Sequence, residues 1–305
     1  MTFDIMLPYY GDVSLMQETV RSVLAQDDGD WRLTVVDDCY PDVRVPDWFH
    51  GLSDSRIRYQ RNARNLGINR NFQKCVELAE FDQVVIIGSD DVMLPNYLRT
   101  VRSVVKDCPD AAIVQPGVEI VNAQGHPYRG LVDHTKQRFY RPRFSGRTIM
   151  RGEPLAVSLL RGNWMYFPAL CWRREAIQSV GFREGLTIVQ DLALVIDLVQ
   201  RGYALAVDET VCFQYRRHDA SVSSRGALAA SRFVEERNYF LDVAERMRAQ
   251  GWGKAARVAH NHVSSRLHAL TLLPGALRGG QRDGVRMLAR HAFGASRKVS
   301  DRQGA

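Results

Sequence analysis

The stretch that decides the fold is residues 84–91, VVIIGSDD, in which four β-branched residues lead through a short turn to two aspartates. An apolar run this short is typical of a strand buried on both faces of a mainly parallel sheet. Similar runs occur at residues 3–7, 33–36 and 111–114. Helical patterns separate these runs, so the sequence predicts an α/β fold with an open, mainly parallel sheet flanked by helices.

Two of the helical patterns illustrate the spacing. In residues 13–24 the apolar side chains fall on one face, and Ser14 and Gln17 are placed as in a capping box. Residues 96–105 form another pattern, which begins just after Pro95, a residue common at helix starts. In an open sheet of this kind, ligands bind beyond the carboxyl ends of the strands.

Length and composition restrict the class of protein. The chain has 305 residues, 45% of them hydrophobic and 25% charged, which allows one globular catalytic domain plus an appendage. No apolar run approaches the roughly 18 residues of a membrane-spanning helix, and residues 1–4 do not resemble a secretory signal. The five cysteines are widely spaced without a C-x-x-C pair, which favours a reduced, cytoplasmic setting.

Charge is unevenly distributed along the chain. Residues 1–215 hold 24 Lys and Arg against 27 Asp and Glu, whereas residues 216–305 hold 17 against 7. An enzyme that acts on nucleic acid would usually have its basic surface around the site itself. The pattern therefore favours a catalytic body with a basic tail and no nucleic-acid partner.

Acidic pairs follow two of the expected strands. Asp37 and Asp38 end one strand, and Asp90 and Asp91 follow another. Charged pairs are costly to bury unless a cation or hydrogen bonds meet them. One pair alone is typical of a helix cap or turn, but two pairs at one sheet edge favour a ligand. A nucleotide diphosphate explains both, because one carboxylate can accept the N3–H of uracil or thymine while another binds a divalent cation that neutralises the diphosphate.

The order of motifs across residues 3–100 resembles that of family 2 glycosyltransferases with the GT-A fold. The segments that carry the resemblance are DIMLPYYG at 4–11, SVLAQ at 22–26, VVDD at 35–38, NLG at 65–67, SDD at 89–91 and LP at 94–95. Weaker similarity continues to about residue 224. The resemblance implies a GT-A-type, Rossmann-like, mainly parallel sheet and transfer of a sugar from a nucleotide diphosphate sugar to an acceptor hydroxyl.

The resemblance also assigns roles to individual residues. It implies that Pro8, Tyr10 and Asp38 line the nucleoside pocket. It further implies that Asp90 lies near the ribose and donor sugar, and that Asp91 ligates the metal, Mn²⁺ or Mg²⁺. UDP- or dTDP-linked donors are favoured over GDP-linked ones, because a lone carboxylate suits a pyrimidine N3–H, but guanine also offers N–H donors and stays the alternative.

The pocket rim departs from the family pattern. Gly11 stands where the family usually has Asn, and Cys39-Tyr40 stand where Gly-Ser or Asn-Ser is usual. The shape of the rim is therefore expected to differ in this chain.

Two further segments are expected near the donor. Arg64 and Asn65 border the turn at Gly67, where a phosphate contact and a solvated face both stay open. Gly162 and Asn163 precede an apolar strand-like run. In proteins of this type, a glycine-containing segment at this place approaches the donor sugar.

The second half of the chain supplies candidates for proton transfer. Asp191 opens a helical pattern at a position where the family commonly has Glu-Asp, with the second acid as general base, and Gln190 replaces the Glu. A carboxylate there would take the proton from the acceptor hydroxyl as it attacks opposite the leaving diphosphate, and this single displacement inverts the anomeric configuration. The alternative for Asp191 is an ordinary first-turn helix acid, and Glu184 is the reserve candidate for the base.

His218 stands where members of this fold often present a late histidine to the metal and diphosphate. A structural or solvated histidine is the alternative. Arg216 and Arg217, directly before it, are either phosphate ligands or surface charges.

The expected organisation is a catalytic domain at 1–224 and a basic helical region at 225–305. Within the catalytic domain, residues 1–115 would bind the nucleotide sugar and residues 116–224 would supply the acceptor and catalytic part. The acceptor itself, whether a glycan, a lipid-linked sugar or a small molecule, stays open, as does a role in polysaccharide or glycoconjugate biosynthesis.

Three helical patterns fill the C-terminal region, the middle one ending near Pro274. Arg282, Arg286 and Arg290 form a stripe on the last helix. That helix would pack on the catalytic body, form a homodimer or lie on an anionic membrane surface, in which case the protein is peripheral at the inner face.

Other functions are less consistent with these motifs. No G-x-x-x-x-G-K-[ST] loop and no early G-x-G-x-x-G is present, which argues against a P-loop ATPase and a Rossmann dehydrogenase. Two alternatives stay open. A nucleotidyltransferase also places metal-binding acids at a sheet edge but releases pyrophosphate, and a non-catalytic protein would bind a nucleotide sugar without transferring it.

Overall fold

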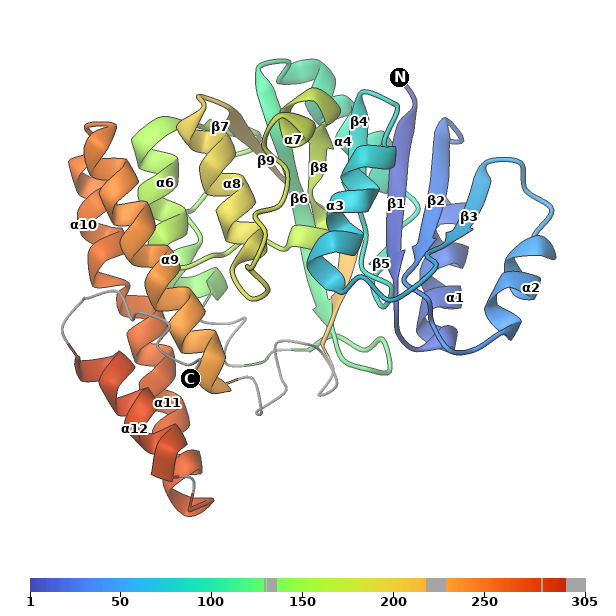
Figure 1. Ribbon diagram of the computed structural model, residues 1–305. Helices are drawn as coiled ribbons and strands as arrows, with labels where there is room; N and C mark the ends of the chain where they lie inside the picture. The colour runs from blue at the N-terminus through green and yellow to red at the C-terminus, as the bar shows by residue number, and fades with distance from the viewer. Residues whose placement is uncertain (129, 131–135, 218–228, 281, 295–305) are drawn as a thin grey trace. The chain divides into compact units, whose positions relative to one another are not determined.

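A computed structural model describes residues 1–128, 130, 136–217, 229–280 and 282–294 (Figure 1). The chain divides into two compact units. The first unit comprises residues 1–134, 143–152 and 165–218, and the second comprises residues 135–142, 153–164 and 219–305.

The first unit is an α/β structure built on one sheet. Its described strands are β1 (Phe3–Tyr9), β2 (Trp31–Asp37), β3 (Ile57–Arg61), β4 (Gln83–Ile86), β5 (Val92–Met93), β6 (Ala111–Val121), β7 (Thr148–Met150), β8 (Cys171–Arg173) and β9 (Ala204–Arg216). Its described helices are α1 (Val13–Leu24), α2 (Arg44–His50), α3 (Ile68–Leu78), α4 (Tyr97–Asp107), the 3₁₀ helix η2 (Phe167–Ala169), α7 (Arg174–Val180) and α8 (Gln190–Gln200).

The strands lie in the order β3-β2-β1-β4-β8-β6-β9-β5, with β7 paired to β9. The strands β1, β2, β3 and β4 are parallel neighbours, and β8 joins β4 to β6 in the antiparallel sense. Figure 1 shows helices on both faces of this sheet, with α3 in front of it. The predicted α/β fold with helices flanking a central sheet is therefore confirmed. The sheet is mixed, since β9 pairs with β6 in the parallel sense but with β5 and β7 in the antiparallel sense.

The core explains why these segments become strands. Ile5, Leu7, Leu33, Val35 and Val85 are fully buried in one hydrophobic cluster. Strands buried on both faces need apolar side chains at nearly every position, which is the pattern that the sequence has.

Helix α1 begins differently from the sequence-based prediction. Asp12 is the N-cap, and its carboxylate accepts a hydrogen bond from the backbone N–H of Leu15 at 3.0 Å. Ser14 donates its hydroxyl to the same carboxylate. The predicted capping box of Ser14 and Gln17 is wrong, because the aspartate two residues earlier takes the capping position.

The register of the sheet brings three strand ends to one edge. Tyr9 at the end of β1 pairs with Asp37 at the end of β2, and Asp37 pairs with Arg61 at the end of β3. On the other side of β1, the N–H of Ile87 donates to the carbonyl of Met6 at 3.0 Å. The turns at Asp38 and at Asp90 and Asp91 therefore follow strands that flank β1.

The second unit is helical in its described residues. Its elements are the π-helical turn η1 (Lys136–Tyr140), α6 (Gly152–Arg161, which begins at the last residue of the first unit's middle segment), α9 (Ala229–Ala249), α10 (Gly253–Asn261), α11 (Val263–Arg278) and α12 (Arg282–Phe293). A small core of Phe233, Ala269, Leu288 and Ala292 joins α9, α11 and α12.

Helix α11 runs through Pro274 to Arg278, so the predicted end near Pro274 is wrong. A proline in a helix removes its own N–H donor and crowds the carbonyl four residues earlier. The helix nevertheless continues past it, and the N–H of Gly279 bonds to the carbonyl of Gly275 at 3.0 Å. Among the described residues, the helices are all too short or too polar to cross a membrane. The predicted division at residue 224 stays a prediction, since it falls at 218–228, outside the described residues.

Candidate active site

Asp38 is buried directly after β2, and its carboxylate holds the turn that starts α3. Its Oδ1 accepts hydrogen bonds from Nδ2 of Asn62 and from the N–H of Leu66, both at 2.8 Å, and its Oδ2 accepts from the N–H of Gly67 at 2.9 Å. Gly67 has a φ of +82°, a conformation that favours glycine. The structure thus joins two of the predicted donor residues, Asp38 and Gly67, through direct bonds.

Asp37 organises the residues beside Asp38. Its carboxylate accepts hydrogen bonds from the hydroxyl of Tyr59 and from the N–H of Tyr40, the latter at 2.7 Å. Cys39, between Asp38 and Tyr40 in the chain, has a φ of 62°, a conformation in which a glycine would be unstrained. The turn therefore accommodates the unusual Cys39-Tyr40 at the cost of one left-handed residue.

Tyr10 and Tyr40 form an aromatic pair beyond the ends of β1 and β2. Their ring centroids are 5.4 Å apart in an edge-on arrangement, and Tyr10 is 54% exposed. Pro8, also predicted for this pocket, pairs in register with Val36 inside the sheet. Tyr10 is among the residues predicted for the pocket and Tyr40 is not, although the unusual residue at position 40 is a sequence signal for a different rim.

Asp91 is almost completely buried in the turn after β4. Its Oδ1 accepts a hydrogen bond from the N–H of Arg216 at 2.9 Å, and Thr19 donates its hydroxyl to the carbonyl of Asp91 at 2.7 Å. Burial, followed by the charge of Asp90, raises the pKa of Asp91 well above its usual value. A Cβ at Gly88 would collide with the Asp91 carboxylate, so this position needs glycine.

Arg216, at the end of β9, fastens this turn to its surroundings. Its Nε donates to the carbonyl of Asp90 at 2.7 Å, its Nη1 to the carbonyl of Ala123 at 3.0 Å, and its Nη2 forms an ion pair with Glu18 at 2.6 Å. The surface-charge alternative for Arg216 is therefore wrong, because its guanidinium is buried and bonded to the protein, whereas the phosphate alternative stays a prediction.

The turn at Asp90 and Asp91 also lies against the end of β1. A Cβ placed on Gly11 would be 3.5 Å from the hydroxyl oxygen of Ser89, which is ordinary contact distance. The hydroxyl of Tyr9 donates to the carbonyl of Gly11 at 3.0 Å. The segment after β1 and the aspartate turn are therefore direct neighbours.

Asp191 lies in the first turn of α8, half-buried, and its Oδ1 accepts the N–H of Leu192 at 2.7 Å. The preceding Gln190 accepts a hydrogen bond on Oε1 from Nδ2 of Asn69 at 2.9 Å. The same amide of Asn69 donates to the carbonyls of Arg183 and Leu186.

Asn69 belongs to the first turn of α3, the helix whose N-cap Gly67 is bonded to Asp38. The start of α3 therefore connects the region of Asp38 with that of Asp191. Glu184, the reserve candidate for the base, is exposed in the loop before α8.

The remaining predicted residues differ in what the structure says of them. Arg64 and Asn65 are exposed, and Oδ1 of Asn65 accepts the N–H of Gly67 at 2.9 Å. Gly162 and Asn163 belong to the second unit, where a Cβ on Gly162 would collide with the ring of Tyr140. His218 lies outside the described residues.

The chemistry of the aspartate turn fits a divalent cation. The described residues contain no group of three His, Cys, Asp or Glu side chains able to hold a metal by themselves. The buried Asp91 beside Asp90 nevertheless has a carboxylate whose charge is poorly compensated, as its raised pKa indicates. A Mg²⁺-type cation commonly uses one or two carboxylates together with substrate phosphates, and such a site needs no protein cage.

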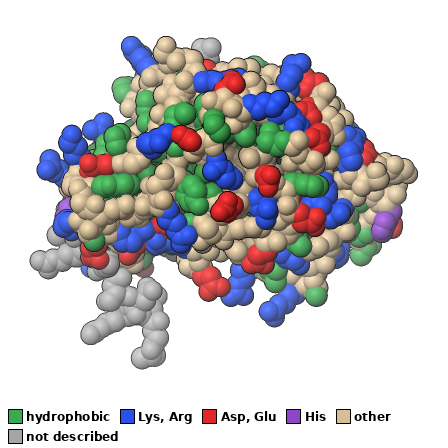
Figure 2. All heavy atoms as spheres, turned by 90° about the horizontal axis from the view of Figure 1, so that it is seen from above, with side chains coloured by type: hydrophobic (Ala, Val, Ile, Leu, Met, Phe, Trp, Pro, Cys, Tyr) green, Lys and Arg blue, Asp and Glu red, His purple; other side chains and the backbone are tan. Residues whose placement is uncertain are grey.

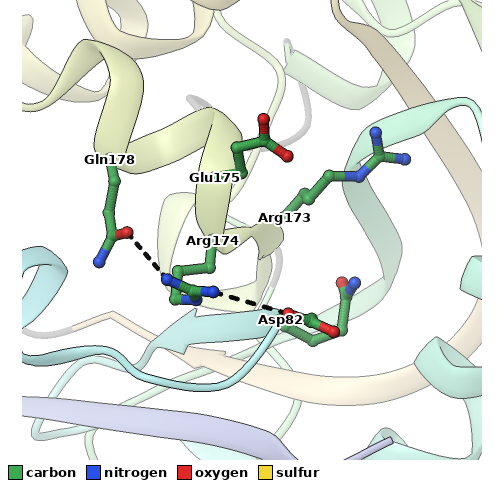
Figure 3. A pocket seen from close by; sticks show the side chains of 6 residues that line it. Asp82, Arg173, Arg174, Glu175 and Gln178 are labelled. Carbon is green, nitrogen blue, oxygen red and sulfur yellow. Dashed lines mark hydrogen bonds and ion pairs between the residues drawn. The ribbon is translucent and has the colours of Figure 1, made fainter.

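A pocket of about 650 Å³ lies at the opposite edge of the sheet (Figure 3). It is lined by Asp82, Gln83, Arg173, Arg174, Glu175 and Gln178. Gln83 is the first residue of β4, so the pocket lies at the amino end of a strand whose carboxyl end leads to Asp91. Arg174 forms an ion pair with Asp82 at 3.7 Å and a hydrogen bond with Gln178 at 3.3 Å.

Figure 2 shows the molecule from the side where β1 begins. Acidic and basic side chains are intermixed on this face, and neither sign of charge dominates it.

An open α/β sheet with acidic turns at the carboxyl ends of its parallel strands is the architecture of GT-A glycosyltransferases. A family model described as "Glycosyl transferase family 2" matches residues 4–171. The chain belongs to glycosyl transferase family 2, and it is a glycosyltransferase, as the motif resemblance predicted.

A named relative and two solved structures are similar to the chain. The "Succinoglycan biosynthesis protein ExoO" of Rhizobium meliloti (strain 1021) is 24% identical over 216 residues, which cover 70% of this chain and 60% of that protein. S. aureus TarS 1–349 in complex with UDP-GlcNAc is 12% identical, with a TM-score of 0.63 over 97% of this chain and 93% of the other.

The mannosyltransferase PcManGT from Pyrobaculum calidifontis, in complex with GDP-Man and Mn²⁺, is 16% identical, with a TM-score of 0.58 over 99% of this chain and 88% of the other. At these identities the two structures show a shared GT-A fold.

Proposed function

We propose that the protein transfers a sugar from a nucleotide diphosphate sugar, UDP- or dTDP-linked, to an acceptor hydroxyl with inversion and with the help of Mn²⁺ or Mg²⁺. The observation that carries the proposal is the grouping of acids at one edge of the sheet. Asp38 and Asp91 follow strands on either side of β1. Asp191 is connected to Asp38 through the first turn of α3.

The donor class is supported by the two similar solved structures, one in complex with UDP-GlcNAc and the other with GDP-Man. The preference for a pyrimidine base rests on Asp38. Both oxygens of Asp38 accept hydrogen bonds from Asn62, Leu66 and Gly67. We therefore assign two roles to Asp38: it holds the turn that forms the pocket wall, and it contacts the base. Tyr10, 54% exposed at the same edge, supplies a face on which a base can stack.

The cation is assigned to Asp91, with Asp90 toward the ribose and donor sugar. When bound, a divalent cation would neutralise the diphosphate and stabilise the charge that grows on it as it leaves. His218 is proposed as a second ligand on the sequence alone. A cation next to Asp91 would relieve the repulsion from Asp90 that contributes to its raised pKa.

The proton acceptor in the proposal is Asp191. A carboxylate within hydrogen-bond reach of the acceptor hydroxyl removes its proton as the oxygen attacks the anomeric carbon. The first turn of α8 holds this carboxylate, and the bond between Asn69 and Gln190 fixes the position of that turn. Arg64 and Asn65 complete the proposed donor contacts of the first unit.

The acceptor is proposed to be a growing glycan of polysaccharide or glycoconjugate biosynthesis. The support is the similar protein whose name refers to succinoglycan biosynthesis; the match covers 60% of that protein's length. A lipid-linked or small-molecule acceptor would use the same proton transfer.

The experiment is an incubation of the purified chain with a panel of nucleotide sugars, with and without Mn²⁺, in which the released nucleotide product is identified. We expect release of UDP or dTDP from one donor, and only with the cation present. Release of pyrophosphate would instead identify a nucleotidyltransferase. A protein that binds the donor but neither transfers the sugar nor slowly hydrolyses the donor would be a non-catalytic binding protein.

A further inference from the structure

The helices α11 and α12 form an antiparallel hairpin within the second unit. Arg266 near the start of α11 donates from Nη1 to the carbonyl of Ala292 at 3.2 Å and from Nη2 to the carbonyl of Gly294 at 3.0 Å. The beginning of α11 therefore lies beside the end of α12, as Figure 1 also shows. The inner side of the hairpin is filled by Ala269 and Leu288.

Large apolar side chains stand on the outside of this hairpin. Val263 is 56% exposed, Leu267 50% and Leu277 63%, and their spacing of four and then ten residues places them on one face of α11. Phe293 is 73% exposed at the end of α12, next to the carbonyls that Arg266 binds. Val263, Leu267 and Phe293 therefore belong to the same end of the hairpin.

The charge of the hairpin has one dominant sign. Residues 263–294 contain five arginines and one acid, Asp283. Three of the arginines, Arg282, Arg286 and Arg290, recur every four residues along α12, and all three are exposed. A partner that covers this surface must be anionic and must also accept apolar side chains.

We propose that the α11–α12 hairpin binds the surface of an anionic lipid membrane. Interfacial helices combine leucine, phenylalanine and valine side chains that enter the acyl boundary with arginines that meet the lipid phosphates. A nucleic acid would use the arginines but leave the apolar side chains in water. A second copy of the chain would bring arginines against arginines. The inference does not depend on the transfer reaction.

The test is sedimentation of the full chain with vesicles of phosphatidylcholine alone or mixed with phosphatidylglycerol. We expect binding only to the mixed vesicles. An arginine near an anionic surface contributes on the order of fivefold in affinity, and Arg→Glu also adds a repelled charge. The triple variant R282E/R286E/R290E should therefore bind at least roughly a hundredfold more weakly. The double variant L267S/F293S keeps the arginines and should also lose binding.

The matched control is R248E/K254E/R257E. These three exposed residues lie on α9 and α10, and the variant makes the same change in net charge. Charges beyond roughly 8 Å are largely screened at physiological salt, so its affinity should stay within about threefold of the parent. Circular dichroism and the midpoint of unfolding verify that all variants are folded.

Several outcomes overturn the proposal. An equal loss of vesicle affinity in the control variant would mean that net charge, and not the surface of the hairpin, causes the binding. Binding to phosphatidylcholine vesicles would remove the role of the arginines. Preferential binding of duplex DNA or RNA, or a dimer in light scattering that L267S/F293S dissociates, would assign the surface to a different partner.

Discussion

Asp91 combines burial with a negative charge, and this makes it the most informative single residue. Replacement by Asn keeps the shape and the acceptor for the N–H of Arg216 but removes the charge that burial and Asp90 disfavour. We expect Asp91→Asn to leave the free energy of unfolding unchanged or raised by about 1 kcal/mol. Donor binding in the presence of Mn²⁺ should fall at least tenfold, as measured by titration calorimetry.

The matched control for this substitution is Asp110→Asn, which removes a charge from an exposed aspartate after α4. It should change neither stability nor donor binding. Donor binding by Asp91→Asn that equals the parent, with and without chelator, contradicts the assignment of the cation to Asp91.

Asp191 is the residue on which turnover should depend. Asp191→Asn keeps a side chain that can accept the N–H of Leu192 but cannot take a proton. General-base catalysis contributes about 10²–10⁴-fold, so kcat should fall by at least a hundredfold while the Kd for the donor stays within threefold.

Glu184→Gln, in the exposed loop before α8, is the companion variant. It should retain most of its activity. A larger loss of kcat in Glu184→Gln than in Asp191→Asn would transfer the role of the base to Glu184.

At this scale, sequence reasoning could locate the acids but not their contacts. Asp38 was selected because an acidic pair follows an apolar strand. Its bonds to the N–H groups of Leu66 and Gly67 span 28 and 29 positions in the chain. Local patterns carry no information on such pairs. The unusual residue at position 40 marks the pocket rim as different, but it does not indicate that Tyr40 packs on Tyr10.

Among the secondary-structure elements, β9 has an unusual role, because its last residue fastens the aspartate turn. Arg216→Met would leave the carbonyl of the half-buried Asp90 without its donor, whereas the exposed Ala123 and the half-exposed Glu18 can bond to water instead. Unsatisfied buried acceptors cost about 1–3 kcal/mol. We expect urea unfolding to show a loss of about 2 kcal/mol and donor binding in the presence of Mn²⁺ to be weaker.

Arg217→Met is the comparison for that variant. The guanidinium carbon of Arg217 lies 4.9 Å from the ring centroid of Tyr215. A methionine side chain can replace part of this contact. The free energy of unfolding of Arg217→Met should therefore fall by less than about 1 kcal/mol. Equal destabilisation by both substitutions would contradict the fastening role of Arg216.

The packing of α9, α11 and α12 predicts a loss of stability in acid. Burial, then the charge of Arg266, lowers the pKa of His262 to about 4, and burial, then His262, lowers that of His291 to about 3. The unfolded chain binds these protons near pH 6.5, so stability is complete above that pH. It falls as the pH drops toward 4, by up to about 1.4 kcal/mol per pH unit for each histidine.

Urea unfolding at pH 7.5, 6 and 5 measures this dependence. His291→Gln can preserve the hydrogen bond to the hydroxyl of Ser265 while it removes one titrating group. The slope of stability against pH should become shallower in this variant. An unchanged slope would mean that other groups cause the acid sensitivity.

For the whole molecule, the open sheet was predictable because strands buried on both faces consist of continuous apolar runs. The composition of the second unit was not. Residues 135–142 and 153–164 interrupt the first unit in sequence but join the C-terminal helices in space. Oε1 of Glu153 accepts the N–H groups of Lys254 and Ala255 at 2.7 and 3.0 Å, across about a hundred positions of the chain. No periodicity within a single segment indicates such a pairing.

This arrangement predicts the result of cutting the chain at residue 224. A fragment of residues 1–224 would keep α6, with its buried Leu155, Leu159 and Leu160, but lose the helices with which α6 forms one unit. We expect the fragment to aggregate or to unfold at least about 10 °C below the full chain in a thermal scan. Glu153→Gln in the full chain weakens only the cap of α10, so its loss should be about 1 kcal/mol. A fragment that unfolds cooperatively at the temperature of the full chain would instead establish residues 1–224 as an independent domain, because α6 would then need nothing from the C-terminal helices.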